Sequence, residues 1–420
     1  MMPSAMAAAV SAEKQSGHRS GFIAAWLGWA FDGLDGMLYP LVAVPFVMEL
    51  LGPGATVPQA AAKAGLIQAI FLVGWAIGGL VFGRIGDALG RSRTLTLTIV
   101  TYAAFTGLSF FAHEWWHLAV FRFLAALGIG GEWAAGSALV SETLPARYRP
   151  WGSAMLQTGY MIGIILAALT VGSFAGFHSY RYVFLVGVLP AVVTIWIRRS
   201  VPEPEEWAGE RTARKMPKIS DLFGPEVRKA TLFTLAVASL ALTCSWTLIY
   251  FSTQVLRGLP EVKAMAKPAV DDLVRSVTIA YSIWNIVGNF LAAAMARYIG
   301  YRRAFIVMAA GGLVAYVVGF AHPRPLDEFK IWMNLSAVFG LGLFALFPLY
   351  LPPLFPTLLR TTGAGFGYNF GRIVAAAGTL YLAMSTAGAV SPHQAIYLSG
   401  LLFIPIILLA FFMPVLKEGT

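Results

Sequence analysis

The chain is organised as a series of long apolar runs separated by short polar segments. Each run has about 20 residues, the length that an α-helix needs to cross the hydrocarbon core of a bilayer. There are twelve such runs, at 21–51, 61–82, 94–112, 118–140, 152–173, 183–197, 231–256, 273–294, 304–321, 330–352, 363–387 and 395–416. We therefore predict an all-α integral membrane protein with about twelve transmembrane helices.

The composition supports this fold class. Of the 420 residues, 58% are hydrophobic and only 12% are charged, and the mean hydropathy is +0.71, which excludes an ordinary water-soluble domain. Cys244 is the only cysteine, so no disulfide can form within the chain. The first 20 residues are polar and alanine-rich and do not resemble a signal peptide, so we expect a disordered cytoplasmic tail.

The net charge is +10, and the basic residues are distributed as the predicted membrane topology requires and not as a nucleic-acid-binding surface would require. Twenty Lys and Arg residues fall on the side of both termini and eight on the other side, while Arg122 and Arg372 lie inside predicted spans. Because basic residues accumulate on the cytoplasmic side, this asymmetry predicts a multi-pass protein of the cell (inner) membrane with both termini in the cytoplasm.

Two separated segments repeat at nearly one offset. Gly78, Gly90 and Arg93 match Gly288, Gly300 and Arg303 at an offset of 210, and Pro145, Arg149 and Gly152 match Pro356, Arg360 and Gly363 at 211. Parallel six-helix repeats place a substrate between the halves, near the bilayer midplane. We predict a tail (1–20), an N-terminal six-helix bundle (21–197), a basic cytoplasmic linker (198–230), a C-terminal six-helix bundle (231–416) and a short tail (417–420).

The loop after the second run carries the sequence GRIGDALGRSR, from Gly83 to Arg93. This segment resembles the loop signature of the major facilitator superfamily. The resemblance implies a latch at the cytoplasmic gate, formed by Gly83, Asp87, Gly90 and Arg91 together with Arg149. It also implies that Asp87 faces the start of the eleventh helix, after Arg360, where the helix dipole favours a carboxylate. The second-half copy has Arg297 in place of the acid.

Other segments resemble particular branches of the superfamily. Asp32-Gly33-Leu34-Asp35 looks like the paired acid of aromatic-acid and sialic-acid proton symporters, and Gly130-Gly131-Glu132 after Arg122 looks like the sialate and lactate group. The resemblance implies a secondary transporter, not an enzyme, that carries a small organic anion with protons by alternating access. The anion would be a monocarboxylate, a sugar acid or an aromatic acid. We expect a monomer in the lipid bilayer, with protons as the coupling ion, no cofactor, no metal and no nucleic-acid partner.

Acids inside predicted spans are candidates for proton coupling, because buried charges are costly and those that persist usually serve transport or pair with one another. Asp32 and Asp35 are three residues apart and share a helix face, so they cannot easily both ionise. A fixed ion pair with a neighbouring arginine is the alternative for either acid. Glu132 lies between Gly128 and Gly136, which also fits an interhelical hydrogen bond.

Polar groups in the second half are candidates for substrate binding. Arg372 lies half-way along the eleventh run with Tyr368 and Asn369 one turn before it, and a guanidinium suits bidentate capture of a carboxylate. A fixed salt bridge is the alternative. Asn285 offers a further hydrogen bond to substrate or to a neighbouring helix. Arg122 has three open roles, which are snorkelling outward, pairing with a first-run acid, and binding the anion.

Other functions fit the sequence less well. His113 to His117 match the zinc-protease pattern HExxH, but they lie in a short outer loop beside paired tryptophans. Gly363 to Gly367 follow no strand, and the chain has no Walker A motif, so nucleotide-driven transport is not expected. A facilitator or exporter of neutral sugars or drugs, and a membrane receptor or sensor without flux, remain the alternatives.

Overall fold

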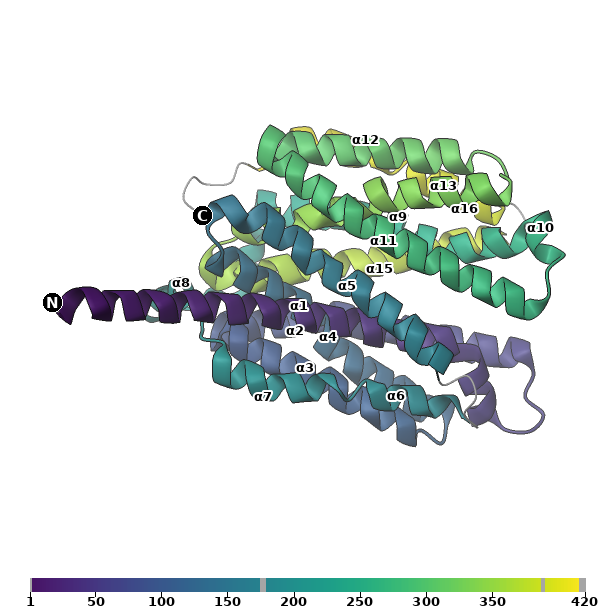
Figure 1. Cartoon of the computed structure of the whole chain (residues 1–420), viewed down its shortest axis with the longest axis horizontal. Helices are drawn as coiled ribbons and strands as arrows, with labels where there is room; N and C mark the ends of the chain where they lie inside the picture. Colours follow the sequence, from purple (N-terminus) through teal and green to yellow (C-terminus); the bar gives the residue numbers. More distant parts are fainter. Residues whose placement is uncertain (1, 174–178, 387–389, 415–420) are drawn as a thin grey trace.

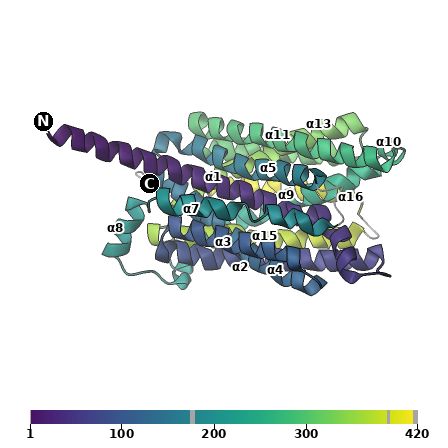
Figure 2. The same ribbon diagram turned by 60° about the horizontal axis from the view of Figure 1, so that its bottom comes forward.

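The computed structural model describes residues 2–173, 179–386 and 390–414. These residues form a bundle of long helices that run roughly parallel to one another (Figures 1 and 2). The first half comprises α1 (Met2–Leu51), α2 (Val57–Leu89), α3 (Arg91–Leu108), η1 (Ser109–Phe111), α4 (Trp115–Thr143), η2 (Ala146–Tyr148), α5 (Arg149–Ser173), η3 (Tyr180–Tyr182), α6 (Val183–Val186) and α7 (Pro190–Ser200).

A linker with α8 (Glu205–Ala213) and η4 (Ile219–Phe223) joins the halves. The second half comprises α9 (Arg228–Gly258), α10 (Pro260–Lys263), α11 (Lys267–Ile299), α12 (Tyr301–Phe320), α13 (Leu326–Ser336), η5 (Ala337–Leu341), η6 (Gly342–Leu346), α14 (Phe347–Tyr350), η7 (Pro352–Leu354), η8 (Thr357–Leu359), α15 (Arg360–Thr386), α16 (Pro392–Gly400) and α17 (Phe403–Phe411).

The predicted twelve-helix membrane fold is confirmed. Within the described part of the chain, 10 helices are long and apolar enough to cross a membrane, with α13 to α14 and α16 to α17 each counted as one span. The other two predicted spans correspond to α6 with α7 and to α15. On α2, Val73, Ile77 and Val81 are 43–47% exposed at four-residue spacing, which suits contact with lipid tails.

The two halves repeat each other in space as well as in sequence. Gly90 (φ +110°) joins α2 directly to α3, and Gly300 (φ +83°) joins α11 to α12, because only glycine takes this backbone conformation without strain. A Cβ on Gly78 would lie 2.1 Å from the Leu127 carbonyl oxygen, and one on Gly288 would lie 2.2 Å from the Val338 carbonyl oxygen. Equivalent glycines therefore allow equivalent close helix crossings in both halves.

Three predicted spans are interrupted, which the sequence prediction of continuous helices did not include. The interruptions lie between α6 and α7, through η5 and η6, and between α16 and α17. Each interruption lies just before a proline, which is Pro190, Pro348 or Pro405. Proline lacks an N–H and its ring clashes with the carbonyl four residues earlier, so the helix breaks or tightens there.

The expectation of a disordered tail at residues 1–20 was wrong, because α1 begins at Met2. Four of the five residues at 5–9 are alanine, and alanine has the highest helix propensity, which favours continuation of the first span. The start of α1 and α8 lie at one end of the bundle and α10 at the other (Figure 1). The predicted tail 417–420 lies outside the described residues.

Candidate substrate cavity, buried charges and latch

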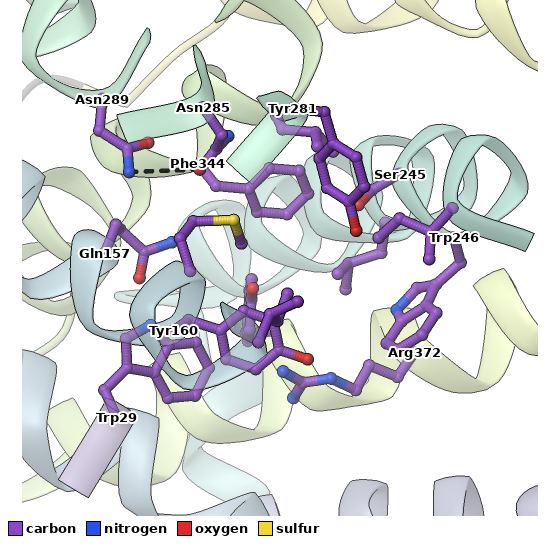
Figure 3. A pocket seen from close by; sticks show the side chains of 16 residues that line it. Trp29, Gln157, Tyr160, Ser245, Trp246, Tyr281, Asn285, Asn289, Phe344 and Arg372 are labelled. Atoms are coloured by element: carbon purple, nitrogen blue, oxygen red, sulfur yellow. Dashed lines mark hydrogen bonds between the residues drawn. The ribbon is translucent and has the colours of Figure 1, made fainter. Parts of the chain in front are cut away.

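A cavity lies between the two halves, at the middle of the bundle. Its volume is about 60 Å³, and it is partly open to solvent. Figure 3 shows its polar and aromatic lining. The lining residues are Trp29, Gln157, Tyr160, Met161 and Ile164 from the first half, and Leu242, Ser245, Trp246, Ile249, Tyr281, Asn285, Asn289, Leu341, Phe344, Tyr368 and Arg372 from the second. A space of this kind suits a small molecule with an apolar body and a few polar groups.

Arg372 is the one charged side chain among these described lining residues. Its guanidinium lies 4.0 Å from the ring centroid of Trp75 and 4.8 Å from that of Tyr368. Nη1 donates a hydrogen bond to Asn369 Oδ1, whereas Nε has no hydrogen-bond partner in the described structure. The two rings and the amide hold the guanidinium in place and leave donors for an anion in the cavity.

The residues beside Arg372 fix its surroundings. Tyr368 stacks on Trp133 of the first half at 4.0 Å between centroids and 17° between planes. Asn369 does not line the cavity; its Nδ2 donates to the carbonyls of Gly130 (3.1 Å) and Gly365 (2.9 Å). Asn369 therefore positions Arg372 and joins the halves, while its predicted direct contact with substrate stays a prediction.

Asn285 and Asn289 line the opposite wall of the cavity on α11 (Figure 3). Asn285 Nδ2 donates to the Ala337 carbonyl at 3.3 Å, where η5 interrupts the helix, and Asn289 Nδ2 donates to Asn285 Oδ1 at 3.4 Å. The Asn289 Oδ1 atom has no partner among the described residues. The pair thus stabilises the broken tenth span and still offers an acceptor toward the cavity.

Arg122 and Asp35 form a buried ion pair inside the first half. Arg122 Nη1 lies 3.1 Å from Asp35 Oδ1, and Thr106 donates to the same oxygen at 2.6 Å. The guanidinium also lies 4.4 Å from the ring centroid of Phe71. Of the three roles left open for Arg122, the one seen in this structure is an ion pair with an acid of the first run, Asp35. Neither side chain lines the cavity.

Asp32 and Glu132 are also buried, but they lack such a partner. Both carboxylate oxygens of Asp32 are without a hydrogen bond in the part of the chain that the structure describes. The positive charge of Arg372 attracts an ionised Asp32, whereas the negative charges of Glu132 and Asp35 repel it. Glu132 Oε2 accepts a hydrogen bond from Thr98 at 3.2 Å, which is the interhelical bond that the glycine spacing suggested.

At the end of the bundle that holds α8, a network of charges closes the contact between the halves. Asp87 accepts four hydrogen bonds: from the backbone N–H groups of Thr361 (3.1 Å) and Thr362 (2.8 Å), and from their hydroxyls (2.9 and 2.6 Å). Since α15 begins at Arg360, the acid lies at a helix N-terminus, as the resemblance implied.

Arg91 and Arg360 complete this network. Arg91 Nη2 lies 2.7 Å from Glu142 Oε1 and donates to the Thr357 carbonyl of the other half at 2.7 Å. Arg360 Nη1 lies 2.9 Å both from Glu142 Oε1 and from Glu206 Oε1 on α8. We call Asp87, Arg91, Glu142, Glu206 and Arg360, with the backbone of 357–362, the latch.

The other predicted gating residues have simpler surroundings. A Cβ on Gly83 would lie 2.9 Å from the Thr361 carbonyl oxygen, so glycine allows α2 to approach α15 closely. Gly90 provides the turn before α3. Arg149 Nε donates to the Leu144 carbonyl of its own half at 3.0 Å. Arg149 therefore holds the turn between α4 and α5, and its predicted gating role stays a prediction.

Glu206 belongs to the linker and strengthens the latch at neutral pH. Burial acts to raise the pKa of Glu206, but Arg360 and the Thr357 hydroxyl outweigh it and hold that pKa below the ordinary value. An acid with a lowered pKa stabilises the folded arrangement above its ordinary pKa, and this contribution is lost only as the pH falls through the lowered value. The Glu206 pair therefore persists throughout the neutral range.

Sequence reasoning missed several of these residues as site residues. Glu142, Glu206 and the cavity residues Trp29, Gln157 and Tyr160 were not predicted to take part. A buried acid such as Glu142 at the end of the fourth run, next to basic motifs, was a usable signal. The aromatic residues gave none, because aromatic side chains occur throughout membrane helices.

The HExxH pattern does not form a metal centre. Glu114 is the residue before α4, where its backbone N–H donates to His117 Nδ1 at 3.3 Å. Across the described ranges, no group of three His, Cys, Asp or Glu side chains could hold a metal ion.

We expect Asp87→Asn to loosen the latch. An amide has one acceptor oxygen where the carboxylate has two, and a hydrogen bond to a charged group contributes about 1.5–3 kcal/mol, so the latched population should fall roughly 10- to 100-fold relative to the open one. The readout is the rate at which a thiol reagent, applied at the latch end, labels Ser245→Cys in a Cys244→Ala background. Asp221→Asn in η4 is the control. Unchanged labelling by Asp87→Asn would contradict this role.

Comparison with known proteins agrees with this architecture. The family model of the Major Facilitator Superfamily matches residues 21–379. The chain is 30% identical to the sialic acid transporter NanX of Escherichia coli, over 91% of this chain and 87% of that protein. It is 28% identical to a probable 4-methylmuconolactone transporter of Cupriavidus pinatubonensis, over 84% and 81% of the two chains. It is 26% identical to the niacin transporter NiaP of Acinetobacter baylyi, over 83% and 82%.

Solved structures share the fold. The proton:xylose symporter XylE, bound to 6-bromo-6-deoxy-D-glucose, superposes with a TM-score of 0.76 at 17% identity, over 96% of this chain and 97% of that one. The human organic anion transporter MFSD10 superposes with a TM-score of 0.68 at 16% identity, over 94% and 99%. With its two six-helix halves and its matched family model, the chain belongs to the Major Facilitator Superfamily, a family of membrane transporters and not of enzymes.

Proposed function

We propose that this protein is a proton-coupled symporter of small organic monocarboxylates in the cell (inner) membrane, with both termini in the cytoplasm. The observation that carries the proposal is Arg372, the one charged side chain among the described residues of a cavity otherwise lined by aromatic, aliphatic and neutral polar groups. A neutral sugar or drug would leave that charge unpaired, whereas a carboxylate would pair with it. Relatives named as transporters of sialic acid and niacin, which each have one carboxyl group, support the same substrate chemistry.

In this mechanism Arg372 binds the substrate carboxylate, and the aromatic wall packs against the substrate body. Trp29 and Tyr160 lie 4.9 Å apart between ring centroids and form one side of that wall. Asn285 and Asn289 offer amide groups to polar substituents on the other side. Conjugated acids and sugar acids both fit these groups, so the class of acid stays open.

Proton coupling rests on the first-half acids. An ionised Asp32 with no hydrogen bond would be very costly when buried, so Asp32 is the acid to which we assign the transported proton. When the cavity is empty and Asp32 is deprotonated, Arg372 serves as its counter-ion. A bound carboxylate takes over Arg372 and favours protonation of Asp32, which links anion binding to proton binding.

Asp35 supplies a second device for coupling. Its ion pair with Arg122 stabilises α1 against α4 only while Asp35 is ionised. Protonation would release Arg122 and weaken that contact. The latch is closed here, so this structure corresponds to a state that faces away from the α8 end, and we infer that loading with proton and anion allows the latch to open.

The test is uptake into proteoliposomes across an imposed pH gradient. We expect radiolabelled carboxylate to accumulate on the alkaline side, by about tenfold per pH unit for an electroneutral one-proton symport. Weak acids such as benzoate cross lipid unaided, so sialate is a better probe, with protein-free liposomes and a protonophore as controls. Uptake that is indifferent to the gradient would overturn proton coupling. Uptake of xylose but of no carboxylate would favour the neutral-sugar alternative.

A further inference from the structure

One face of α1 carries two buried acids and a glycine that contacts a third buried acid. Gly28, Asp32 and Asp35 are four and three residues apart, so they share a face over about 10 Å of helix. All three are buried. Since α1 starts at the latch end of the bundle, Gly28 is the nearest of the three residues to the latch and Asp35 is the farthest (Figure 1).

The Glu132 side chain of α4 packs against Gly28 of α1. A Cβ on Gly28 would lie 1.5 Å from Glu132 Oε1, so the carboxyl rests directly against the backbone of α1. The other oxygen, Oε2, accepts the hydrogen bond from Thr98. Only glycine at position 28 leaves room for this arrangement, which places the Glu132 carboxyl one helical turn from Asp32.

Buried polar atoms of Glu132, Asp32 and Tyr102 have unused hydrogen-bonding capacity. Glu132 Oε1, both Asp32 oxygens and Tyr102 Oη are buried without a partner among the described residues. Tyr102, on α3, is close enough to interact electrostatically with Glu132, Asp32 and Asp35. Among the titratable or charged groups on the helices packed against α4 are Asp32 and Asp35 of α1, Arg84 and Asp87 of α2, Tyr102 of α3, Tyr160 of α5, Tyr350 of α14, and Tyr368 and Arg372 of α15.

A charge count indicates what this set can hold. Three buried acids, Asp32, Asp35 and Glu132, face two buried arginines, Arg122 and Arg372. The empty set is neutral when it holds one proton. A bound monocarboxylate adds one negative charge, so the loaded set is neutral with two protons. Buried sets of charge are most stable when neutral, which links one transported proton to each anion.

We propose that Glu132, seated on Gly28, is the inner proton site of a relay along α1, with Asp32 as the middle site and Asp35 as the outer one. In the relay step, the proton on an Asp32 oxygen passes to the Glu132 carboxylate, directly or through the Tyr102 hydroxyl. Asp32 becomes a carboxylate and takes Arg372 as its counter-ion when the substrate leaves. Glu132 then releases the proton at the latch end once the latch opens. Gly28 acts as a positioning residue.

This inference rests on the proposed symport function. The experiment compares net accumulation driven by a pH gradient with exchange of labelled for unlabelled sialate at equal pH, because exchange needs no net proton release. We expect Glu132→Gln to lose accumulation, from about tenfold to none for one pH unit, and to keep exchange within about twofold of the natural chain. Gly28→Ala should have the same effect, because its Cβ displaces the carboxyl.

Controls make the outcome decisive. Gly21→Ala is the matched substitution on α1, since its Cβ would meet Leu139 at an ordinary 3.4 Å, and it should behave like the natural chain. Glu132→Asp, which keeps a carboxyl, should retain part of the accumulation even if Glu132→Gln folds poorly. Full accumulation by Glu132→Gln, or loss of exchange in the folded variant, would overturn the relay. A natural chain that ignores the gradient would instead overturn the symport function itself.

Discussion

Replacing Arg372 with glutamine is expected to weaken carboxylate binding by a hundredfold or more and to abolish measurable uptake. A guanidinium that binds a carboxylate through two charged hydrogen bonds, at about 1.5–3 kcal/mol each, accounts for a loss of at least this size. Arg372→Lys should be almost as severe. Lysine keeps the charge but loses the planar fork that Trp75 and Tyr368 hold between them.

The measurement is equilibrium binding of labelled carboxylate to purified protein, followed by uptake into proteoliposomes. Arg275→Gln is a matched control, because Arg275 is an exposed arginine on α11 that pairs with Asp272 and does not line the cavity. Removal of Arg275 should leave binding unchanged. If Arg372→Gln binds carboxylate as tightly as the natural chain does, Arg372 does not bind the substrate and the function must rest on other groups.

The fold was predictable because segments that cross a membrane must be apolar, and apolar segments can be identified in a single sequence. Apolar runs of spanning length give the number of helices, and the offset between Gly90 and Gly300 gives the two halves. The positions at which helices are interrupted were harder to predict from the sequence. The chain breaks before Pro190, Pro348 and Pro405 but continues through Pro40 and Pro45 in α1. Whether a proline interrupts a helix depends on the packing around the freed carbonyl, which a single sequence does not state.

The candidate site was predictable in its chemistry and less so in its pairing. The position of Asp87 at the start of α15 followed from a loop signature and a helix dipole. Asp32 and Asp35 looked alike in sequence, yet one is unpartnered and the other is bound to Arg122 and Thr106. Their difference depends on which side chains the neighbouring helices bring to each face, and this is fixed only by tertiary packing.

The same packing explains why the cavity's aromatic lining was not predicted. Trp29 and Tyr160 belong to helices of the first half, and they line the cavity only because α1 and α5 face the second half. In sequence they cannot be told from aromatic residues that face lipid. Arg372 was predictable because an arginine at that depth has few other tolerable surroundings.

Asp35→Asn is expected to lose gradient-driven accumulation and to destabilise the protein by about 3–5 kcal/mol, because it leaves the buried Arg122 guanidinium without its carboxylate. Asp35→Asn with Arg122→Gln removes the unpaired charge as well. The double variant should recover most of the stability, measured by thermal unfolding in detergent, but none of the accumulation. This comparison separates the structural part of the ion pair from its part in coupling.

The opposite results are equally informative about Asp35. If Asp35→Asn keeps full accumulation, the pair with Arg122 is a fixed structural bridge and coupling belongs to Asp32 and Glu132 alone. If the double variant regains accumulation along with stability, the single variant failed through misfolding, and Asp35 again has no part in coupling. Only loss of accumulation in a stable double variant supports Asp35 as a proton site. Such a result would give the asymmetry of the two halves a mechanical meaning, since the first half would then bind the proton and the second the anion.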